Sequence, residues 1–472
     1  MFDSLPDVES LADAEDAVVI AAIEGWAQAE AAASARRLAA IAELVRRRCA
    51  DDDDPRALWC VDMWSSAAAE VGAALDITPR RASSQMHLAQ ALRTRLPKVG
   101  ALFLAGKLSA HIAGAIAWRT HLVLDTEAME RIDGDIAQQS YTFGPMSGTK
   151  LEQAIDRAIA NHDPAALVQF EIAARDRNVE FGKPDDETGT ASIWGRLYRT
   201  DAEVLDRRLD ALARSVCDAD PRSIGQRRAD AIGAMANRAE RLICRCGQPD
   251  CSTLGSPAPP PPPVVVHMVA ERTAVQAAVE NRLGPGAVLI SGGVIPTPLL
   301  GELIRNGAKL KPLRVPSDDA EPRYRPSAAL QDFIRARDLT CRFPGCDTPA
   351  EYCDVDHTIP YPAGPTHPSN LSCKCRKHHL LKTFWTGPDG WTDNQLPDGT
   401  LRWTSPSGRV YTTVPGSRLF IPAWDTRTAP LSAATAIPRP DGRARKMPMR
   451  RRTRSADRAQ RIKAERALNN TS

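Results

Sequence analysis

Long hydrophobic runs are missing from this sequence of 472 residues. No stretch approaches the roughly 18 uninterrupted apolar residues of a membrane-spanning helix, so a membrane bundle is excluded and no membrane partner is expected. Residues 1–15 are acidic and lack a basic region followed by an apolar one, so we expect no secretory signal. Hydrophobic residues make up 43% of the chain and charged residues 25%, which excludes wholesale disorder and a collagen-like rod.

Proline is scarce in the first half of the chain. Only eight of the 37 prolines precede residue 246, so long helices are possible there and disfavoured afterwards. The spacing of apolar residues predicts helices over residues 11–49, 65–96, 100–118, 126–140, 148–162, 201–215 and 226–243. Residues 168–197 alternate instead and predict a hairpin that turns at 185–189. The first half therefore reads as a helical domain with a small β insertion.

The second half is organised by proline and cysteine. Residues 256–263 contain six prolines and predict a stiff polyproline spacer, followed by a strand at 264–269 and helices near 271–282 and 297–306. We expect an α+β protein with five parts. They are a helical domain at 1–250, a Cys/Pro-rich linker at 251–263, a small α/β segment and linker at 264–326, a compact Cys/His-rich domain at 327–415, and a basic, disordered tail at 416–472.

Cysteine and charge are both unevenly distributed. The 11 cysteines are too few for a disulfide scaffold and cluster near histidines, which indicates thiols and metal in a reducing cytoplasm. The net charge of +3 hides a basic end, because residues 439–472 hold 12 Lys and Arg against three acidic residues. A basic tail on a mildly acidic body suggests an anionic partner, DNA first, whose binding should weaken with salt. Nothing in the sequence identifies a protein partner.

One set of Cys and His residues has zinc-ligand spacing. Cys341 and Cys346 form one pair, and Cys375 and His378 form another about 30 residues later. Two such pairs fit a closed tetrahedral structural Zn²⁺ site. Cys373 is an extra thiol that could compete as a ligand.

A second set of polar residues lies in the same segment: Asp356, His357, Asn370 and His379. On a helix, His378 and His379 point about 100° apart, so His379 can face a site other than zinc. A carboxylate and an imidazole can hold Mg²⁺ or another divalent cation, and His357 can take a proton from water. Asn370 has the atoms either to orient that histidine or to join the metal shell. Basic residues beside the site are candidates for phosphate contacts: Arg376, Lys377 and Lys382.

In order and spacing, these residues resemble an HNH endonuclease domain of the zinc-stabilised ββα-metal type, over residues 341–385. The resemblance implies His357 as general base, Asp356 and His379 as ligands of the catalytic ion, and Asn370 as a positioning residue. The motifs RRADA at 227–231 and RLP at 95–97, with the helical half before the HNH end, resemble the actinobacterial "thirteen-E-twelve" repeat family. That family's long N-terminal domain has no assigned function.

Two functions remain as hypotheses. The first is a cytoplasmic, metal-dependent DNA endonuclease that leaves a 5′-phosphate, as the resemblance implies. The alternative is a non-catalytic zinc-containing DNA-binding or scaffold protein of a repeat or mobile-element family. The presence of all four residues of the second set favours the enzyme.

Two further segments have both a functional and a structural interpretation. Cys244, Cys246 and Cys251 can make a zinc knuckle, with His267 a distant candidate for the fourth ligand, or a surface loop without metal. Residues 66–92 read as helix, turn and helix, and Arg80 is one of the residues placed to contact DNA in a helix-turn-helix. An ordinary corner between two packed helices is the favoured interpretation of that segment.

Overall fold

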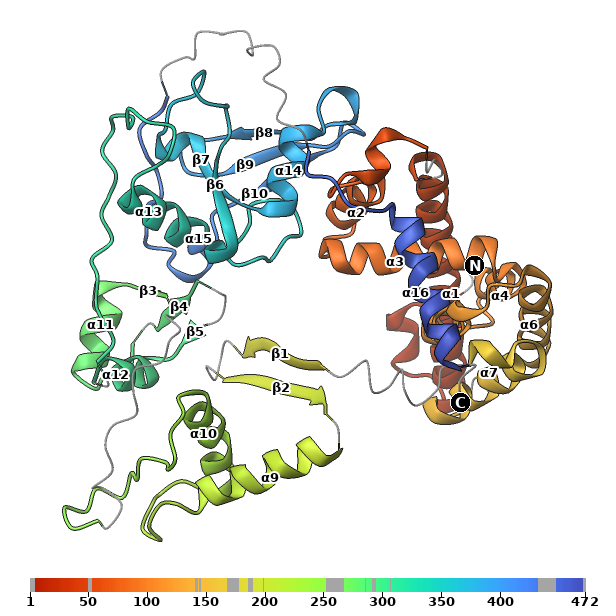
Figure 1. The fold of residues 1–472 in the computed structure, drawn as a ribbon, viewed down its shortest axis with the longest axis horizontal. Coiled ribbons are helices and arrows are strands. Elements are labelled where there is room, and N and C mark those ends of the chain that lie inside the picture. Colours follow the sequence, from red (N-terminus) through yellow and green to blue (C-terminus); the bar gives the residue numbers. More distant parts are fainter. Residues whose placement is uncertain are drawn as a thin grey trace. The chain divides into compact units, whose positions relative to one another are not determined.

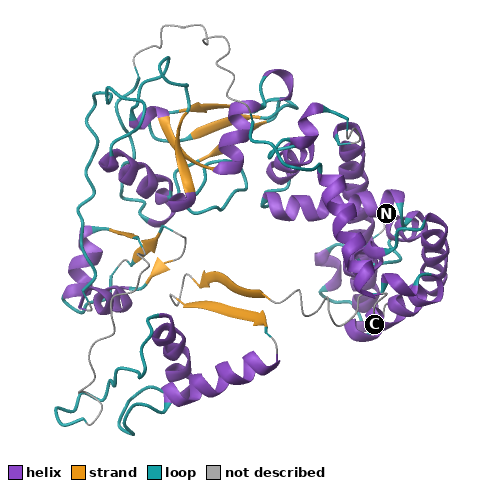
Figure 2. Ribbon diagram, viewed as in Figure 1, coloured by secondary structure: helices purple, strands orange, loops and turns teal. Residues whose placement is uncertain are grey.

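A computed structural model describes residues 5–49, 53–140, 143, 146–167, 178–185, 190–197, 199–251, 267–284, 286–290, 294–305, 307–431 and 447–469. These residues form helices and small antiparallel sheets (Figures 1 and 2), so the α+β class is confirmed. The chain divides into two compact units, Met1–Gln169 with Leu310–Ser472 and Phe170–Lys309. The second unit is thus inserted between two parts of the first, whereas the sequence suggested a boundary at 250. None of the described helices is both long and apolar enough to cross a bilayer.

The N-terminal part of the first unit is helical. Its helices are α1 (Asp16–Arg48), α2 (Met63–Ala74), α3 (Pro79–Thr94), α4 (Pro97–Leu104), α5 (Ala110–Arg119), α6 (Thr126–Gln139) and α7 (Gly148–His162). Four of them begin at a side chain that accepts a hydrogen bond from the amide three residues later, at Asp62, Thr78, Ser109 and Asp125. Helix α1 packs against α3 and α4 along buried alanines, whose small side chains permit close approach. These local signals explain why the helices were predictable.

The C-terminal part of the first unit holds the Cys/His-rich residues. Its elements are α13 (Ala328–Asp338), β6 (Cys353–His357), β7 (Leu371–Cys375), α14 (Arg376–Phe384), β8 (Thr392–Gln395), β9 (Leu401–Thr404), β10 (Val410–Thr413) and α15 (Ser417–Phe420). Strands β6 and β7 form an antiparallel ribbon that pairs Cys353 with Cys375 and His357 with Leu371, and α14 follows directly. Strands β10, β9 and β8 form a second antiparallel sheet in that order (Figure 1).

A buried charge network ties these elements together. The Asp338 carboxylate, fully buried at the end of α13, accepts hydrogen bonds from Arg337 Nε at 2.8 Å and Arg342 Nη1 at 3.0 Å. It also accepts one from the amide of Cys373 in β7 at 2.8 Å. Burial would raise the pKa of Asp338, but the two guanidinium groups outweigh it and hold the pKa below its usual range. Arg337 also donates a hydrogen bond to the carbonyl oxygen of Leu371, and Arg342 donates one to the carbonyl oxygen of Thr413.

The turn between α2 and α3 packs against the Cys/His-rich part of the same unit. Gly345 has φ +70°, and a Cβ there would lie 2.6 Å from the carbonyl oxygen of Ile77. Only glycine allows this approach. This contact gives the helix–turn–helix a packing role, in keeping with a structural corner.

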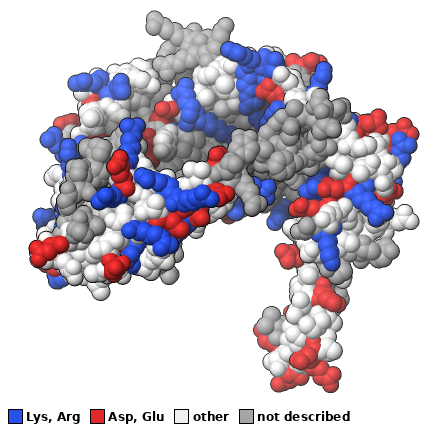
Figure 3. Space-filling model, turned by 60° about the horizontal axis from the view of Figure 1, so that its bottom comes forward, with Lys and Arg blue, Asp and Glu red and all other residues white. Residues whose placement is uncertain are grey.

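The basic C-terminal segment was expected to be disordered, but residues 447–469 adopt a defined structure. Its backbone runs beside residues 58–60, with the Cys60 amide bonded to Pro448 O at 2.8 Å, and then forms α16 (Arg454–Asn469). Arg450 and Arg454 bind the buried carboxylate of Asp62. Arg466 likewise binds Asp163. Buried acids of the helical part thus bind several of the tail's cations. On the face of the molecule shown in Figure 3, Lys and Arg are interspersed with Asp and Glu.

The second unit consists of small pieces of structure. They are the hairpin β1 (Asn178–Asp185) with β2 (Thr190–Arg196), the helices α9 (Arg199–Ala213) and α10 (Ile224–Ala236), the sheet of β3 (Met268–Ala270), β4 (Ala287–Leu289) and β5 (Val294–Ile295), and the helices α11 (Arg272–Val279) and α12 (Thr297–Arg305). The predicted hairpin is confirmed by its antiparallel register. Its turn at 186–189, the spacer at 256–263 and the start of the strand at 264–266 lie outside the described residues.

The first prediction concerns the Asp338 network. Asp338→Asn should lower the free energy of unfolding by about 3–5 kcal/mol, because two buried guanidinium groups lose their carboxylate. Denaturant unfolding monitored by tryptophan fluorescence measures the change. Asp332→Asn on the same helix is the matched control, since its pair with Lys311 is largely exposed and should matter little. Equal effects of the two substitutions would contradict the central role of Asp338.

The docked tail makes a second prediction. Arg454→Ala should lower the free energy of unfolding by about 1–2 kcal/mol, because the buried carboxylate of Asp62 loses charged hydrogen bonds. Arg451→Ala is the control, since Arg451 is exposed in the same segment. Thermal unfolding of the two variants compares them. Equal stability of the two variants would mean that α16 contributes little to the fold.

Candidate metal centre and active site

Four predicted zinc ligands meet at the junction of β7 and α14. Cys341 and Cys346 come from the loop after α13, Cys375 ends β7, and His378 lies in the first turn of α14. Their ligand atoms all lie within 4.8 Å of one another. His378 Nδ1 is 3.3 Å from Cys375 Sγ and 3.5 Å from Cys341 Sγ. Tetrahedral zinc with bonds of about 2.0–2.3 Å separates its ligands by roughly 3.5–3.8 Å, so this group can hold a zinc ion.

The surroundings of this cluster suit thiolates. The amide of Cys375 donates a hydrogen bond to Cys341 Sγ at 3.3 Å. Hydrogen bonds from Cys341 and Cys346 lower the pKa of the Cys375 thiol. The ring of Phe343 stacks on His378 with centroids 4.0 Å apart and orients the imidazole.

The other two cysteines of this segment lie outside the cluster. Cys373, which the sequence left as a possible competitor, directs its thiol toward the carbonyl of Ile334 in α13. Cys353 is buried and donates to the carbonyl of Pro349 at 3.3 Å. Both act as small buried residues in the structure.

An Asp/His pair lies on the other side of α14. His379 Nε2 is 3.3 Å from Asp356 Oδ1, and His379 Nδ1 donates a hydrogen bond of 2.8 Å to Asp354 Oδ2. In the neutral imidazole that bond places the proton on Nδ1 and leaves the Nε2 lone pair facing a carboxylate oxygen. Two acceptors this close favour a cation between them, either a proton or a metal ion. Carboxylate–histidine–metal arrangements have this form.

Two lysines also surround Asp356. Lys382 Nζ lies 2.9 Å and Lys374 Nζ 3.3 Å from Asp356 Oδ2, and both ammonium groups also contact Asp393. Burial would raise the pKa of Asp356, but these cations and His379 hold it well below its usual range. Burial would lower the pKa of Lys374, yet Asp393 and Asp356 raise it. Asp356 is therefore ionised, with part of its charge already compensated by the protein.

His357 is buried and held in one orientation. Its Nε2 lies 2.9 Å from Thr366 Oγ1, whose hydroxyl donates in turn to Tyr324 O at 3.3 Å. Because the Thr366 hydroxyl has one proton and donates it to Tyr324 O, its oxygen accepts a hydrogen bond from His357 Nε2–H. The lone pair of the neutral imidazole is therefore on Nδ1. The Tyr324 ring stacks on the imidazole at 5.3 Å. Burial lowers the pKa of His357 below its usual value, which favours the neutral ring.

Asn370 braces the loop that follows His357. Its Oδ1 accepts from the amide of Ile359 at 2.8 Å, and its Nδ2 donates to the carbonyls of Ile359 and Pro365 at 2.9 Å. The residue is fully buried. Of the two roles that the sequence left open, this geometry fits the positioning role.

The three predicted phosphate-binding residues differ in exposure. Arg376 is exposed and lies 3.5 Å from Asp354. Lys377 is half-buried, and burial lowers its pKa. Lys382 points inward to Asp356, so its place is within the site and not on a flanking surface.

Five residues of this site were not predicted from the sequence. They are Asp354, Lys374, Asp393, Thr366 and Tyr324. Asp354 had a signal, since it stands two residues from Asp356 and therefore on the same face of a strand. Lys374 pairs with Asp354 across the ribbon, which required the register. The remaining three come from distant loops and strands without a local signal.

The family model that matches this chain ends before the site, whereas two relatives match nearly the whole chain. The family model described as "Domain of unknown function (DUF222)" matches residues 26–338. Two uncharacterized proteins of Mycobacterium tuberculosis H37Rv, Rv3776 and Rv2100, are 54% and 52% identical to it over 99% of this chain and over 93% and 91% of their own lengths. Another from that strain, Rv1128c, is 24% identical over 72% of this chain and 75% of its own. No solved structure matches the chain.

The metal centre makes a third prediction. Cys375→Ser should reduce bound zinc by one equivalent per chain and lower the melting temperature, because structural zinc contributes directly to folding. Cys60→Ser removes a half-buried thiol that lies outside the cluster and should keep its zinc. Elemental analysis of both purified variants measures the difference. Unchanged zinc in Cys375→Ser would remove this residue from the ligand set.

Proposed function

We propose that this chain, which belongs to the DUF222 family, is a metal-dependent endonuclease of the HNH type that hydrolyses phosphodiester bonds of DNA. The observation that carries the proposal is the approach of Asp356 Oδ1 to His379 Nε2, 3.3 Å apart, on a β6–β7–α14 ribbon and helix. The family model ends at residue 338, so the proposed chemistry lies beyond the matched region. It is supported by the residues of the site and by the resemblance of residues 341–385 to HNH domains.

The donor atoms fit a divalent cation. Asp356 presents an ionised oxygen and His379 an imidazole lone pair, while Asp354 fixes the tautomer of His379 from behind. A bound Mg²⁺ or similar ion would supply charge neutralisation at the phosphate and at the leaving oxygen. Asp356 and His379 are the residues that would hold it.

His357 is proposed as the general base. Thr366 holds its Nε2–H, so Nδ1 takes the proton from the attacking water. Asn370 keeps the loop after His357 in place through three hydrogen bonds. Arg376 is exposed beside the site and can contact a flanking phosphate.

One observation favours a second candidate, a non-catalytic zinc-containing DNA-binding or scaffold protein. Lys382 and Lys374 already approach Asp356 within 2.9 Å and 3.3 Å, so the carboxylate has cationic partners within the protein. A divalent ion has to compete with Lys382 for this carboxylate. The zinc cluster does not depend on that competition, because its four ligands lie apart from Asp356.

The fourth prediction separates the two candidates. Wild-type protein should nick supercoiled plasmid DNA in the presence of Mg²⁺ or Mn²⁺, and His357→Ala should reduce the rate by about 10²–10⁴-fold through loss of the base. Zinc content should remain unchanged in that variant, whereas the melting temperature should fall modestly, because removal of the buried imidazole leaves a cavity. His111→Ala, an exposed histidine of the helical part, is the matched control.

Two outcomes would contradict parts of this proposal, the first the assigned base and the second the enzyme itself. Cleavage that survives His357→Ala would reject His357 as the base. DNA binding with a full zinc content and no metal-dependent cleavage by the wild type, on plasmid, nicked and branched substrates, would favour the scaffold.

A further inference from the structure

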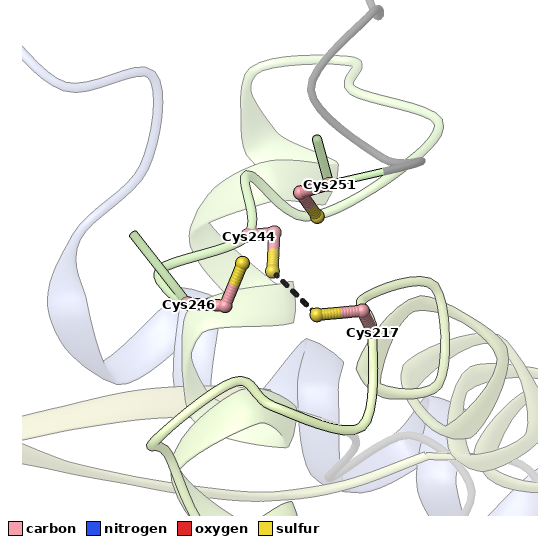
Figure 4. A group of neighbouring side chains, drawn as sticks. All are labelled: Cys217, Cys244, Cys246 and Cys251. Carbon is pink, nitrogen blue, oxygen red and sulfur yellow. Dashed lines mark hydrogen bonds between the residues drawn. The ribbon is translucent and has the colours of Figure 1, made fainter. Parts of the chain in front are cut away.

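Four cysteines converge in the second unit, whereas the site described above belongs to the first. Cys217 follows α9, whereas Cys244, Cys246 and Cys251 follow α10 (Figure 4). The sequence pointed to the last three and offered His267 as a fourth partner. The structure instead brings in Cys217, which is 27 residues before Cys244.

The sulfur atoms have the separations of a tetrahedral centre. All four lie within 4.8 Å of one another, and Cys217 Sγ is 3.5 Å from Cys244 Sγ. Zinc–sulfur bonds of about 2.3 Å place the sulfurs of a tetrahedron about 3.8 Å apart. Figure 4 shows the four side chains directed toward a common centre. A disulfide requires a bond of about 2.05 Å, and none joins the described cysteines.

The backbone around Cys246 is shaped to hold a thiolate. Gly247 has φ +70°, a conformation that glycine adopts without steric cost. The turn that this creates directs the amide of Gln248 at Cys246 Sγ, at 3.5 Å. An N–H donor aimed at sulfur stabilises the ionised form that metal binding needs.

The protein positions both cysteine-bearing segments with other contacts. The buried carboxylate of Asp220, three residues after Cys217, accepts hydrogen bonds from Arg222 and from the amide of Arg245 at 2.9 Å. Ser215 Oγ accepts from the amide of Leu242 at 2.9 Å. These bonds link the segment after α9 to the segment after α10 on both sides of the cluster. Hydrogen bonds outside the cluster therefore hold Cys217 close to the other three cysteines.

The apolar core at this point is small. The fully or nearly buried residues that pack together here are Leu212, Val216, Ala231, Leu242, Cys244 and Cys251. Two of the six are cysteines of the cluster. Small cores commonly require a metal or a disulfide for stability.

We propose that Cys217, Cys244, Cys246 and Cys251 bind one structural zinc ion, in addition to the ion of the Cys/His centre. Four protein ligands leave no position open for water or substrate, so the centre is structural and not catalytic. It fastens the end of α9 to the segment after α10. His267 takes no part in it.

Zinc stoichiometry of the full chain tests the proposal. Native mass spectrometry and elemental analysis should find two zinc ions per wild-type chain, one in Cys217→Ser, one in Cys375→Ser and none in the double variant. Cys60→Ser, a half-buried thiol outside both clusters, is the matched control and should keep two. His267→Ala should also keep two. These readouts do not involve DNA cleavage, so they stand or fall independently of the proposed nuclease.

The wild-type protein alone can also overturn the proposal, even if the variants fail to fold. One zinc per chain, with Cys375→Ser abolishing it, would leave the four-cysteine group without a metal. Titration of the denatured, chelated protein should find all 11 thiols of the sequence, whereas cysteines paired as disulfides would lower that number. Iron in place of the second zinc would reject the identity of the ion, since four thiolates also suit iron.

Discussion

The buried carboxylate of Asp338 is the interaction on which the candidate active site depends. It joins the end of α13 to the middle of β7 through the amide of Cys373, and to the loop before Cys346 through Arg342. These two buried guanidinium groups and the buried carboxylate stabilise one another, because an unpaired charge in a protein interior is costly. We therefore expect α13, the zinc loop and the β6–β7 ribbon to form as one cooperative piece.

The β6–β7–α14 segment supports two different sites because neighbouring residues point in different directions. Cys375 and His378 face the zinc cluster, while Lys374 and His379 face Asp356. Strand alternation and the 100° step of a helix produce this division. One site has four candidate zinc ligands, and the other combines Asp356 and His379, the proposed ligands of a divalent ion, with two competing ammonium groups. The proposed nuclease activity therefore depends on the charge balance around Asp356.

The two thiol-rich groups share a local design although they belong to different units. In each, a glycine with φ +70° stands beside a cysteine, Gly345 before Cys346 and Gly247 after Cys246. In each, a backbone amide donates to a sulfur.

Ion pairs also connect the C-terminal segment to the helical part of the first unit. Arginines of α16 bind the carboxylates of Asp62 and Asp163. A tail that appears as a free basic arm in the sequence is in part a structural element.

Features that depend on near neighbours could be predicted from the sequence. Helical periodicity and capping residues such as Thr78 identified most helices, and short ligand spacings identified Cys341, Cys346, Cys375 and His378. Three features became visible only in the folded chain: Cys217 joins the second cluster, Lys382 points at Asp356, and the inserted unit begins near residue 170. The two sets of features differ in the sequence distance over which the interactions act. Capping and spacing act within a few residues, whereas ion pairs and metal ligands are chosen by which segments the packed core brings together.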